Sequence, residues 1–552
     1  MIAKKYGKNN NGNLGKKILS ILLVLAMVLS CAACSSSETT KKKKKTKKSK
    51  TSKTEYTSEP DETSDEPSES TDEPTKTSED PTETTRDPNL PEGQKVYLPA
   101  EIGFGTGTQN EMTAKLLELD RVVAAEYRGK PISNDRYFVV FEMPLDWKNP
   151  DAGTFFLRTG FTYVSDDTAT NFCCNGYMLN DIYFDYDFRS EIGERYDLNQ
   201  IDCEYRFFGA SVPEGLDNTS TDLWEYLTAA NAAADFHHII EQYKTFLTGK
   251  WAFTGGSKGG QLTHFQSYFY PDDCDLYFSF VAPGGVSPEA PDFFDNIYTT
   301  IGNEAYGKEQ AAAYRDLVLQ FQVEAMKLKP QLAERYYQDG LDMGCVFTDY
   351  TTPEILYDMA VLEFATITWQ YSQDFYSIEQ ALAMDKSSQE FVDEVYDQIF
   401  IANDPSTWST TTPFYPYYIQ AATENGEHEY DFSFIREALK KEGLEDLLTV
   451  TEDMESGLLY RMVFTPAQLA TFTFDSSLYD AMVEWSHTTE KTVIMFYGAS
   501  DVWYAMRLPD VTDNPNVHIY VDQKASHIGS FTGLPSSERA EIDGLVSRTL
   551  DL

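Results

Sequence analysis

Apolar and polar residues alternate along two segments near the start of the folded region, RYFVVFEMPLDW and GTFFLRTGFTYV. A two-residue period is typical of strands, and two such segments in succession predict an antiparallel pair. Two shorter apolar runs follow, FCCNGYM and QIDCEYRFFG, and glycine follows each apolar stretch. We expect both of these runs to be buried strands.

Helical and strand patterns alternate in the next part of the chain. TDLWEYLTAANAAADFHHIIEQYKTFL has helical spacing behind a Thr/Asp start. KWAFTGGSKGGQLTHFQSYF predicts a strand, a sharp turn and a helix, and DLYFSFVAPGG predicts another strand. Strands that alternate with helices predict an α/β fold, in which helices cover both faces of the sheet.

The pattern changes between about Pro288 and Thr488 to long, aromatic-rich helical stretches. Strand patterns then return in KTVIMFYG and NVHIYVD near the C-terminus. We interpret residues 288–488 as a helical cap inserted into a sheet domain, whose two parts are residues 95–287 and 489–552.

The first 34 residues predict an export signal. Lysines precede an apolar run of about 13 residues, which is shorter than the roughly 20 that a membrane span needs. The run ends in SCAACSSS, which resembles a bacterial lipobox, so we expect lipidation of Cys34, with Cys31 as the alternative. The protein would then be extracellular and lipid-anchored to the outer face of a bacterial cell membrane. An ordinary cleaved signal is the competing interpretation.

Residues 35–94 have the composition of a tether. The segment is lysine-rich from Lys41 to Lys53 and then rich in Ser, Thr, Glu, Asp and Pro. Because it has almost no apolar residues to bury, it cannot offset the entropy cost of ordering, and we expect it to be disordered. A lipid-anchored protein needs a spacer of this kind to clear a cell wall.

Charge and cysteine content narrow the classes of function. The formal net charge is −43, and no cluster of Lys and Arg interrupts the folded region, which argues against nucleic-acid binding. Two of the seven cysteines lie in the leader, and the other five show no CxxC spacing. We therefore expect no zinc site and no cofactor. One or two disulfides fit this number and leave at least one thiol over; the oligomeric state stays open.

The strongest local signal is Gly255-Gly256-Ser257-Lys258-Gly259-Gly260, which contains G-x-S-x-G. A nucleophilic serine at the end of a strand needs a turn so tight that side chains on its neighbours would clash. The motif lies between the strand-like WAFT and the helix-like QLTHFQSYF, which is the expected setting. It predicts an α/β-hydrolase with Ser257 as nucleophile; a purely structural glycine-rich turn is the alternative.

The acid and the histidine of such an enzyme follow the serine along the chain, each after a strand. VIMFYGASD supplies Asp501, and VHIYVDQKASH supplies His527. Asp510 and Asp522 compete with Asp501 for the acid role. The other histidines fit packed or solvated positions better than the role of a base.

Acyl transfer also needs N–H donors that stabilise the oxyanion. The backbone N–H of Lys258 is one candidate, and the loop Gly176-Tyr177 after FCCN is the second. The Lys258 side chain could act as the base of a Ser-Lys enzyme, but the Asp/His pair makes that role unnecessary. We expect this side chain to form a salt bridge.

Several segments together resemble the secreted bacterial prolyl tri/tetrapeptidyl aminopeptidases, which are serine peptidases of the α/β-hydrolase fold related to prolyl carboxypeptidase. They are EYRFFGASVP, TDLWEYLTAANAAADFHHII, WAFTGGSKGG, YPDDCDLYFSFVAP, FYGASDVW and SHIGSFTGLP. The resemblance implies a catalytic triad of Ser257, Asp501 and His527 and the release of short N-terminal peptides after proline. The sequence departs from the family pattern at Tyr205, where His is usual, at Asn231 and at Val502.

An enzyme that releases short N-terminal peptides must recognise the free α-ammonium, so it needs a fixed carboxylate near the site. Glu204 is our candidate, and its alternative role is an ion pair with Arg206 or another base. An apolar pocket for proline could come from an aromatic stretch of the cap, with Trp369, Tyr371, Phe375 and Tyr376.

Three functions remain in competition. The first is a serine exopeptidase with peptide substrates. The second is an esterase or acyltransferase of the same fold. The third is a catalytically inactive surface-binding lipoprotein, which the intact Ser/Asp/His order opposes. A fluorophosphonate label separates the third from the others, and a panel of X-Pro and ester substrates separates the first two.

A chain that begins at Lys95 should fold and hydrolyse substrate as fast as one that begins at Cys34, because residues 35–94 have nothing to bury. Thermal unfolding and kcat/KM of the two chains check this. Failure of the shorter chain to fold would show that the tether contributes to the core.

Overall fold

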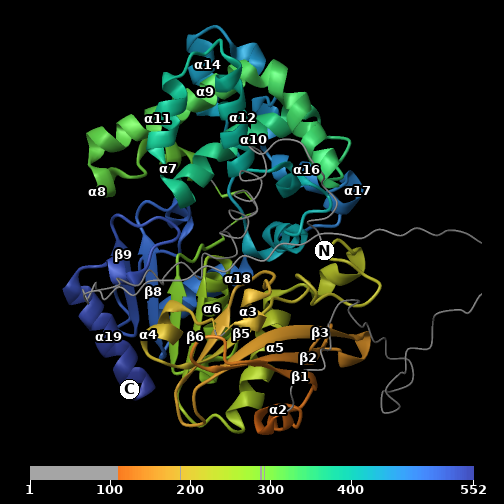
Figure 1. Cartoon of the computed structure of the whole chain (residues 1–552), viewed down its shortest axis with the longest axis vertical. Coiled ribbons are helices and arrows are strands. Elements are labelled where there is room, and N and C mark those ends of the chain that lie inside the picture. The colour runs from red at the N-terminus through yellow and green to blue at the C-terminus, as the bar shows by residue number, and fades with distance from the viewer. Residues whose placement is uncertain (1–109, 187, 286, 288, 291) are drawn as a thin grey trace, which may run out of the picture. The chain divides into compact units, whose positions relative to one another are not determined.

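The computed structural model describes residues 110–552 except 187, 286, 288 and 291 (Figure 1). The predicted export signal, the tether and both candidate lipidation sites, Cys31 and Cys34, lie outside the described residues. Within the described ranges, no helix is long and apolar enough to cross a bilayer.

In the described part of the chain, nine strands form one sheet in the order β1-β2-β3-β5-β4-β6-β7-β8-β9. The pairs β1–β2, β2–β3 and β3–β5 are antiparallel, and all neighbours from β5 to β9 are parallel. The strands are β1 (Val122–Gly129), β2 (Asp135–Pro144), β3 (Thr154–Tyr163), β4 (Thr170–Cys174), β5 (Asn199–Cys203), β6 (Trp251–Gly256), β7 (Leu276–Phe280), β8 (Thr492–Gly498) and β9 (Val517–Asp522). The antiparallel pair β2–β3 and the strands β4 to β9 lie where the apolar patterns predicted them.

Helices cover both faces of the sheet because its buried strands are apolar on both sides. Along β8, Val493 and Met495 belong to one apolar cluster, whereas Ile494 and Phe496 belong to another. Alternate residues of a strand point to opposite faces, so the two clusters are two layers of core. The helices of these layers are α2 (Glu111–Leu116), α4 (Glu191–Arg195), α5 (Ala229–Lys244), α6 (Lys258–Phe269) and α19 (Ser536–Leu550). Helix α3 (Ile182–Asp185) packs in a third, smaller cluster with residues of β2 and β3.

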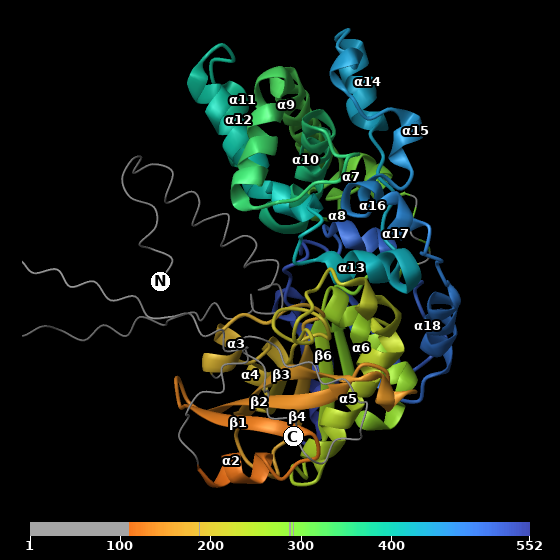
Figure 2. The same cartoon turned by 90° about the vertical axis from the view of Figure 1, so that its right-hand side faces the viewer.

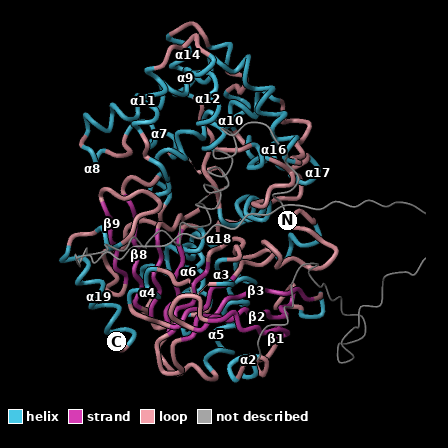
Figure 3. The backbone as a smooth tube through the Cα atoms, viewed as in Figure 1, coloured by secondary structure: helices cyan, strands magenta, loops and turns pink. Residues whose placement is uncertain are grey.

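The assignment of helices to layers follows from the same clusters. Helices α5 and α6 contribute to the first cluster, and α4 and α19 contribute to the second. Figure 3 shows the strands as a central band with these helices around it. A mostly parallel sheet with an antiparallel edge, crossover helices on both faces and a G-x-S-x-G turn after a central strand is the α/β-hydrolase fold, as predicted.

The helix expected from Thr221 onward is shorter than its pattern suggested. Residues Thr221–Tyr226 form a 3-10 turn, and α5 begins only at Ala229. The side chain of Thr228 accepts a hydrogen bond from the N–H of Asn231 and caps the helix. The N-cap residue Thr228 thus starts a new helix within the segment that the periodicity had suggested to be one continuous helix.

The segment between β7 and β8 is helical, and most of it lies on one side of the sheet domain (Figures 1 and 2). Its α-helices are α7 (Phe293–Thr299), α8 (Asn303–Tyr306), α9 (Lys308–Met343), α10 (Pro353–Ile367), α11 (Phe375–Ala383), α12 (Gln389–Ala402), α13 (Tyr415–Gln420), α14 (Ser433–Lys441), α15 (Glu452–Glu455), α16 (Leu458–Val463), α17 (Pro466–Leu469) and α18 (Ser477–Thr488). The last of them, α18, contacts both α6 of the sheet domain and the π-helical turn Ala421–Asn425 of the cap.

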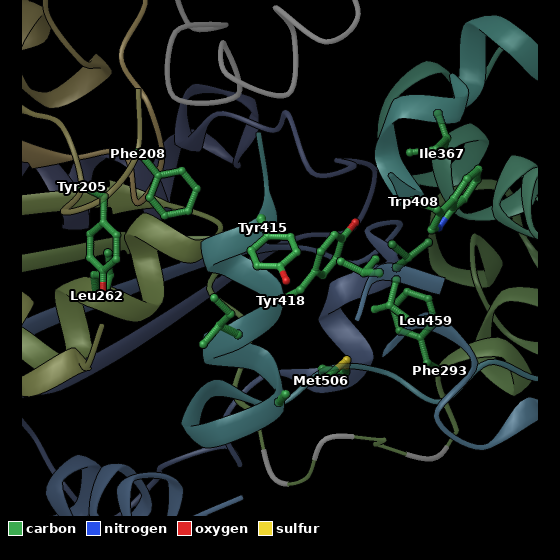
Figure 4. Packing of buried hydrophobic residues seen from close by; sticks show 14 of the residues in the cluster. Tyr205, Phe208, Leu262, Phe293, Ile367, Trp408, Tyr415, Tyr418, Leu459 and Met506 are labelled. Atoms are coloured by element: carbon green, nitrogen blue, oxygen red, sulfur yellow. The ribbon is translucent and has the colours of Figure 1, made fainter. Parts of the chain in front are cut away.

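The cap and the sheet domain share one apolar cluster. Figure 4 shows it running from Tyr205 and Leu262 in the sheet domain to Tyr418 and Trp408 in the cap. Two π-helical turns of the cap, Thr368–Ser372 and Ala421–Asn425, continue α10 and α13 on the side that meets the sheet domain. Such turns are frequent at functional sites.

The glycines of the G-x-S-x-G turn are needed for a close approach of backbone segments. A Cβ on Gly255 would overlap the carbonyl oxygen of Gly259, and a Cβ on Gly259 would overlap that of Cys174, at the end of β4. Both neighbours are backbone atoms, which cannot move aside as the end of a side chain can.

We expect Gly259→Ala to lower the free energy of unfolding by about 1–3 kcal/mol, the usual cost of overpacking. Gly544→Ala in α19 is the matched control, because its Cβ would meet only the flexible end of Arg548. That change should be neutral or stabilise by about 0.5–1 kcal/mol, the cost of glycine in a helix. Urea unfolding of the three proteins measures both effects, and equal stabilities would contradict the packing argument.

Candidate active site

Ser257 lies in the turn between β6 and α6, where the strand-turn-helix pattern predicted it. Its φ of +55° falls in the left-handed region, which a non-glycine residue rarely adopts. The Ser257 N–H donates to the carbonyl of Phe280 at 2.9 Å, which holds the turn against β7. Serine at the start of a helix usually caps it, but this hydroxyl makes no such hydrogen bond. The Ser257 hydroxyl therefore does not serve as a helix cap.

Asp501 follows β8, and His527 follows β9, so both are at the carboxyl ends of parallel strands. The Nδ1 of His527 lies 2.8 Å from Oδ2 of Asp501, and both side chains are 1% exposed. The other carboxylate oxygen accepts the N–H of Trp503 at 3.1 Å. The carboxylate can only accept, so it fixes the proton of a neutral imidazole on Nδ1. The remaining nitrogen, Nε2, is then unprotonated and able to take up a proton.

The competing acids lie elsewhere. Asp510 forms an exposed ion pair with Arg507, and Asp522 accepts the N–H of Lys524 in a turn. The Nε2 of His527 is buried and has no hydrogen-bond partner among the described residues, Ser257 included. The structure thus brings Asp501 and His527 into contact and leaves the hydroxyl of Ser257 unbonded to them.

The loop expected to supply an oxyanion donor lies against the Ser257 turn. Gly176 has a φ of +80°, and a Cβ there would come within 3.0 Å of the N of Gly259 and the Cγ of Lys258. The side chain of Lys258 is 2% exposed, and its Nζ donates to the carbonyl of Gly176 at 2.9 Å. The predicted salt bridge of Lys258 is wrong, since no carboxylate in the described part of the chain pairs with it. Instead, Nζ lies 3.5 Å from the centre of the Tyr205 ring.

A pocket between the sheet domain and the cap contains Ser257, Lys258 and Tyr177. Tyr371 of the cap lines it and meets the ring of His527 at 5.8 Å, edge to face, which connects the pocket to the Asp501–His527 pair. Eight of the 24 residues that line it are Tyr, Trp or Phe. The aromatic residues of the lining are Tyr177, Tyr371, Trp408, Phe414, Tyr417, Tyr418, Tyr430 and Trp503.

The cap side of the pocket contains two carboxylates with a histidine between them. His428 lies 2.7 Å from Glu427 through Nδ1 and 3.4 Å from Glu363 through Nε2. All three residues line the pocket and are at most 7% exposed. Burial opposes a charge on His428, but the two carboxylates outweigh it and raise the pKa of His428 to about 9. The cluster therefore contains one more acidic group than basic groups.

The structure does not place Glu204 at the pocket, so the assignment of Glu204 to a substrate ammonium was wrong. Its carboxylate is 0% exposed and forms two hydrogen bonds with Arg158, at 2.6 and 2.8 Å. It also accepts the N–H of Leu179 and the hydroxyl of Ser211. Arg206 is paired with Asp235 instead. Glu204 thus stabilises the end of β5, as its alternative interpretation proposed, with Arg158 as the base.

Only one residue of the predicted aromatic stretch, Tyr371, lines the pocket. Trp369 and Phe375 pack on each other with ring centres 4.9 Å apart in the core of the cap, and Tyr376 is 69% exposed. The pattern located an aromatic helix but not its orientation. Sequence reasoning also missed Glu363 and Glu427, since 64 residues separate them and only the fold brings both beside His428.

The cysteines and a group of possible metal ligands lie apart from this chemistry. All five described cysteines are buried and none is disulfide-bonded, so the disulfides that their number allowed do not form among them. Within the described ranges, His237, Glu241 and Asp273 are the one group whose ligand atoms could hold a cation, with all atoms within 4.8 Å. None of the three lines the pocket.

Comparison with known proteins decides the family. A family model described as PS-10 peptidase S37 matches residues 111–542. The chain belongs to this family. It is also 26% identical over 408 residues to the prolyl tri/tetrapeptidyl aminopeptidase of Streptomyces mobaraensis, which covers 73% of this chain and 77% of the relative. This S37 chain is therefore a serine peptidase of the α/β-hydrolase fold.

Solved structures of low similarity include two bacterial proteins. An acetylester hydrolase from Corynebacterium glutamicum is 11% identical, with a TM-score of 0.32. The match covers 76% of this chain and 94% of the hydrolase chain. Rv0554 from Mycobacterium tuberculosis is also 11% identical, with a TM-score of 0.33, and covers 74% of this chain and 98% of its own.

Proposed function

We propose that this S37 peptidase releases short peptides from the N-termini of its substrates by cleavage after proline, with Ser257, His527 and Asp501 as the catalytic triad. One observation carries the proposal: a single pocket contains Ser257 and, on its cap side, the carboxylates Glu363 and Glu427. A nucleophile and an anionic cluster in one pocket suit a substrate that has a scissile bond and, a few residues before it, a free ammonium.

In this mechanism the Ser257 hydroxyl attacks the scissile carbonyl, and Nε2 of His527 takes the proton. Asp501 keeps the imidazole in the required tautomer and stabilises the imidazolium that forms. The C–N bond then breaks as His527 gives the proton to the leaving amine. Water then attacks the acyl-enzyme as His527 takes its proton. The ester bond to Ser257 breaks as His527 returns that proton to the serine oxygen, which releases the N-terminal peptide. Catalytic hydrogen bonds often form fully only in the substrate complex. The mechanism therefore does not require a hydrogen bond between Ser257 and His527 in the absence of substrate.

The negative charge on the tetrahedral intermediate needs N–H donors. The first N–H groups of a helix have no partner within it, and Lys258 is the first residue of α6. The second donor in this proposal is the N–H of Tyr177, in the loop that lies against the same turn. The N-terminus of α6 adds a favourable dipole for developing negative charge.

The cap carboxylates are the proposed partners of the substrate's α-ammonium. Glu427 is held by the hydroxyl of Tyr417 at 2.5 Å and by His428, so its position is fixed before substrate binds. Because the cluster with Glu363 has two acidic groups and one basic group, it favours a cation over an acylated N-terminus. The peptide length would then follow from the separation between this cluster and Ser257.

Proline fits the aromatic wall of the pocket, since a pyrrolidine ring is apolar and packs well on aromatic faces. The name of the Streptomyces relative, a prolyl tri/tetrapeptidyl aminopeptidase, supports the same specificity. We further propose that the protein acts outside a bacterial cell, where a lipid on Cys34 anchors it and residues 35–94 provide reach.

Ser257→Ala should abolish fluorophosphonate labelling and lower kcat by about a million-fold, because it removes the nucleophile.

Asp501→Asn should lower kcat by about ten-thousand-fold with little change in KM, because the amide favours the wrong tautomer of His527. Kinetics on a peptide with proline at the cleavage position measure both. Asp510→Asn is the matched control for the acid, and a larger loss in that variant than in Asp501→Asn would move the acid.

Acetylation of a substrate's N-terminus should lower kcat/KM by about ten- to a hundred-fold, the equivalent of one charge-assisted contact of about 1.5–3 kcal/mol. Glu427→Gln and Glu363→Gln should each remove much of this difference between free and acetylated peptides. Glu204→Gln should preserve the difference, because its carboxylate binds Arg158 outside the pocket.

Equal cleavage of free and acetylated peptides by the unmodified enzyme would contradict the aminopeptidase specificity. If p-nitrophenyl esters were then turned over faster than either peptide, the esterase alternative would take its place.

A further inference from the structure

We propose that the side chain of Lys258 positions the oxyanion loop: its ammonium binds the carbonyl of Gly176 and thereby directs the N–H of Tyr177 toward the reacting carbonyl. This inference rests on the proposed role of Ser257 as nucleophile. Lys258 is a positioning residue in this role, since it acts through the loop and not on the substrate.

The contact between Lys258 and the loop is short and buried. Lys258 directly follows Ser257, so its backbone belongs to the nucleophile turn while its side chain reaches the neighbouring loop after β4. The Nζ donates to the Gly176 carbonyl at 2.9 Å, and the side chain is 2% exposed. One residue therefore links the two backbone segments that would supply the oxyanion donors.

The geometry of the peptide group explains how this contact orients the next N–H. The Gly176 carbonyl and the Tyr177 N–H belong to one planar trans peptide, in which they point in opposite directions. Fixing the carbonyl toward Nζ therefore fixes the N–H toward the other side of the loop. Gly176 has a φ of +80°, a left-handed conformation that residues with a Cβ rarely adopt.

A lysine at this position is expensive unless its charge has a use. Burying an ammonium without a carboxylate partner costs free energy that a methionine of similar shape would avoid. The ring of Tyr205, 3.5 Å from Nζ, compensates part of this cost through its π face, and Tyr177 and Phe208 lie at 5.5 and 5.2 Å. A positive charge beside the oxyanion loop also favours the negative charge that develops there.

Groups from three elements act on this ammonium. The loop after β5 contributes Tyr205, whose hydroxyl accepts a hydrogen bond from Gln420 of the cap at 2.9 Å. Cys174 ends β4, and Glu424 belongs to the π-helical turn after α13. Burial lowers the pKa of Lys258 to about 7, against the opposing effects of Cys174 and Glu424. Burial also raises the pKa of Glu424 to about 7.

The sign of the pH dependence separates this role from that of a Ser-Lys base. A base must be neutral, so activity would rise as the pH increases through the pKa of Lys258. A charged ammonium binds the Gly176 carbonyl more strongly than a neutral amine does, so in the positioning role kcat would fall over the same range. Lys258→Arg keeps the charge to a higher pH and should move this alkaline fall upward, whereas Lys258→Met should remove it.

The direct test compares an oxyanion-forming inhibitor with a product. A tripeptide aldehyde ending in prolinal forms a tetrahedral adduct with Ser257, whereas the matching tripeptide acid occupies the pocket without one. Loss of a single oxyanion donor typically costs about a hundred- to a thousand-fold in kcat. A misdirected donor should cost Lys258→Met about ten- to a hundred-fold in kcat and in aldehyde affinity, with product affinity and KM unchanged.

Lys250→Met is the matched control, because it removes a lysine that forms a surface ion pair with Asp275. Lys250 lies directly before β6, the strand that ends at the Ser257 turn. It should change none of these quantities. Partial recovery of kcat in Lys258→Arg would support the role of the charge. Unchanged kcat in Lys258→Met, or an equal loss of aldehyde and product affinity, would overturn the inference.

Two further outcomes are distinguishable. If Ser257→Ala retained activity and fluorophosphonate labelling, the proposed nucleophile itself would be wrong; loss of both in that variant with a fully active Lys258→Met would overturn only the role of Lys258. If Lys258→Met did not fold, the test is the pH dependence of aldehyde and product affinity in the unmodified enzyme, measured between about pH 5 and pH 10. Aldehyde affinity that falls with rising pH while product affinity stays constant supports the inference, and parallel profiles overturn it.

Discussion

The close approach of three backbone segments around Ser257 is the constraint on which the rest of the site depends. The end of β4, the end of β6 and the first turn of α6 meet so closely that Gly255 and Gly259 leave no room for a Cβ. This contact forces Ser257 to a φ of +55° and places the loop after β4 beside the helix start. One packing arrangement of main-chain atoms thus positions both the proposed nucleophile and the proposed oxyanion donors.

Buried ion pairs hold the segment that supports this arrangement. Asp202, Glu204 and Arg206 are spaced two residues apart along β5 and its continuation, and each is paired with a buried or half-buried partner. Breaking such a pair leaves an uncompensated charge in the core, at a cost of about 3–5 kcal/mol. Glu204 also accepts the N–H of Leu179, so the loop that follows Tyr177 is attached to the same network.

The sequence was most informative where chemistry and chain order coincide. The G-x-S-x-G motif between a strand and a helix identified Ser257, and the order of strands led to Asp501 and His527, which the structure brings into contact. The reason is local: each residue follows its own strand directly. Strands β2 to β9 were predictable for the same reason, since each is an alternating or apolar run bounded by turns. The edge strand β1 was not predicted, because only one of its residues is buried and it lacks a clear apolar pattern.

The substrate end of the pocket was not predictable in this way. Glu363 and Glu427 meet at His428 only because α10 and the loop after α13 pack together, and no local pattern encodes that contact. The substrate-binding role assigned to Glu204 was wrong because a carboxylate near an arginine looks the same in sequence whether it binds a ligand or a base 46 residues away. The pocket position assigned to Trp369 was wrong because helical spacing does not reveal which side of a cap helix meets the pocket.

The apolar cluster shared by the sheet domain and the cap has a consequence for how substrates are selected. Opening the cap would expose side chains such as Tyr418 and Trp408 to water, at roughly 25 cal/mol for each Å². The cap over Ser257 therefore shares a folded core with the sheet domain. Under the proposed function, a substrate must reach Ser257 beneath this cap, which favours flexible chain ends and short peptides over bulky folded proteins.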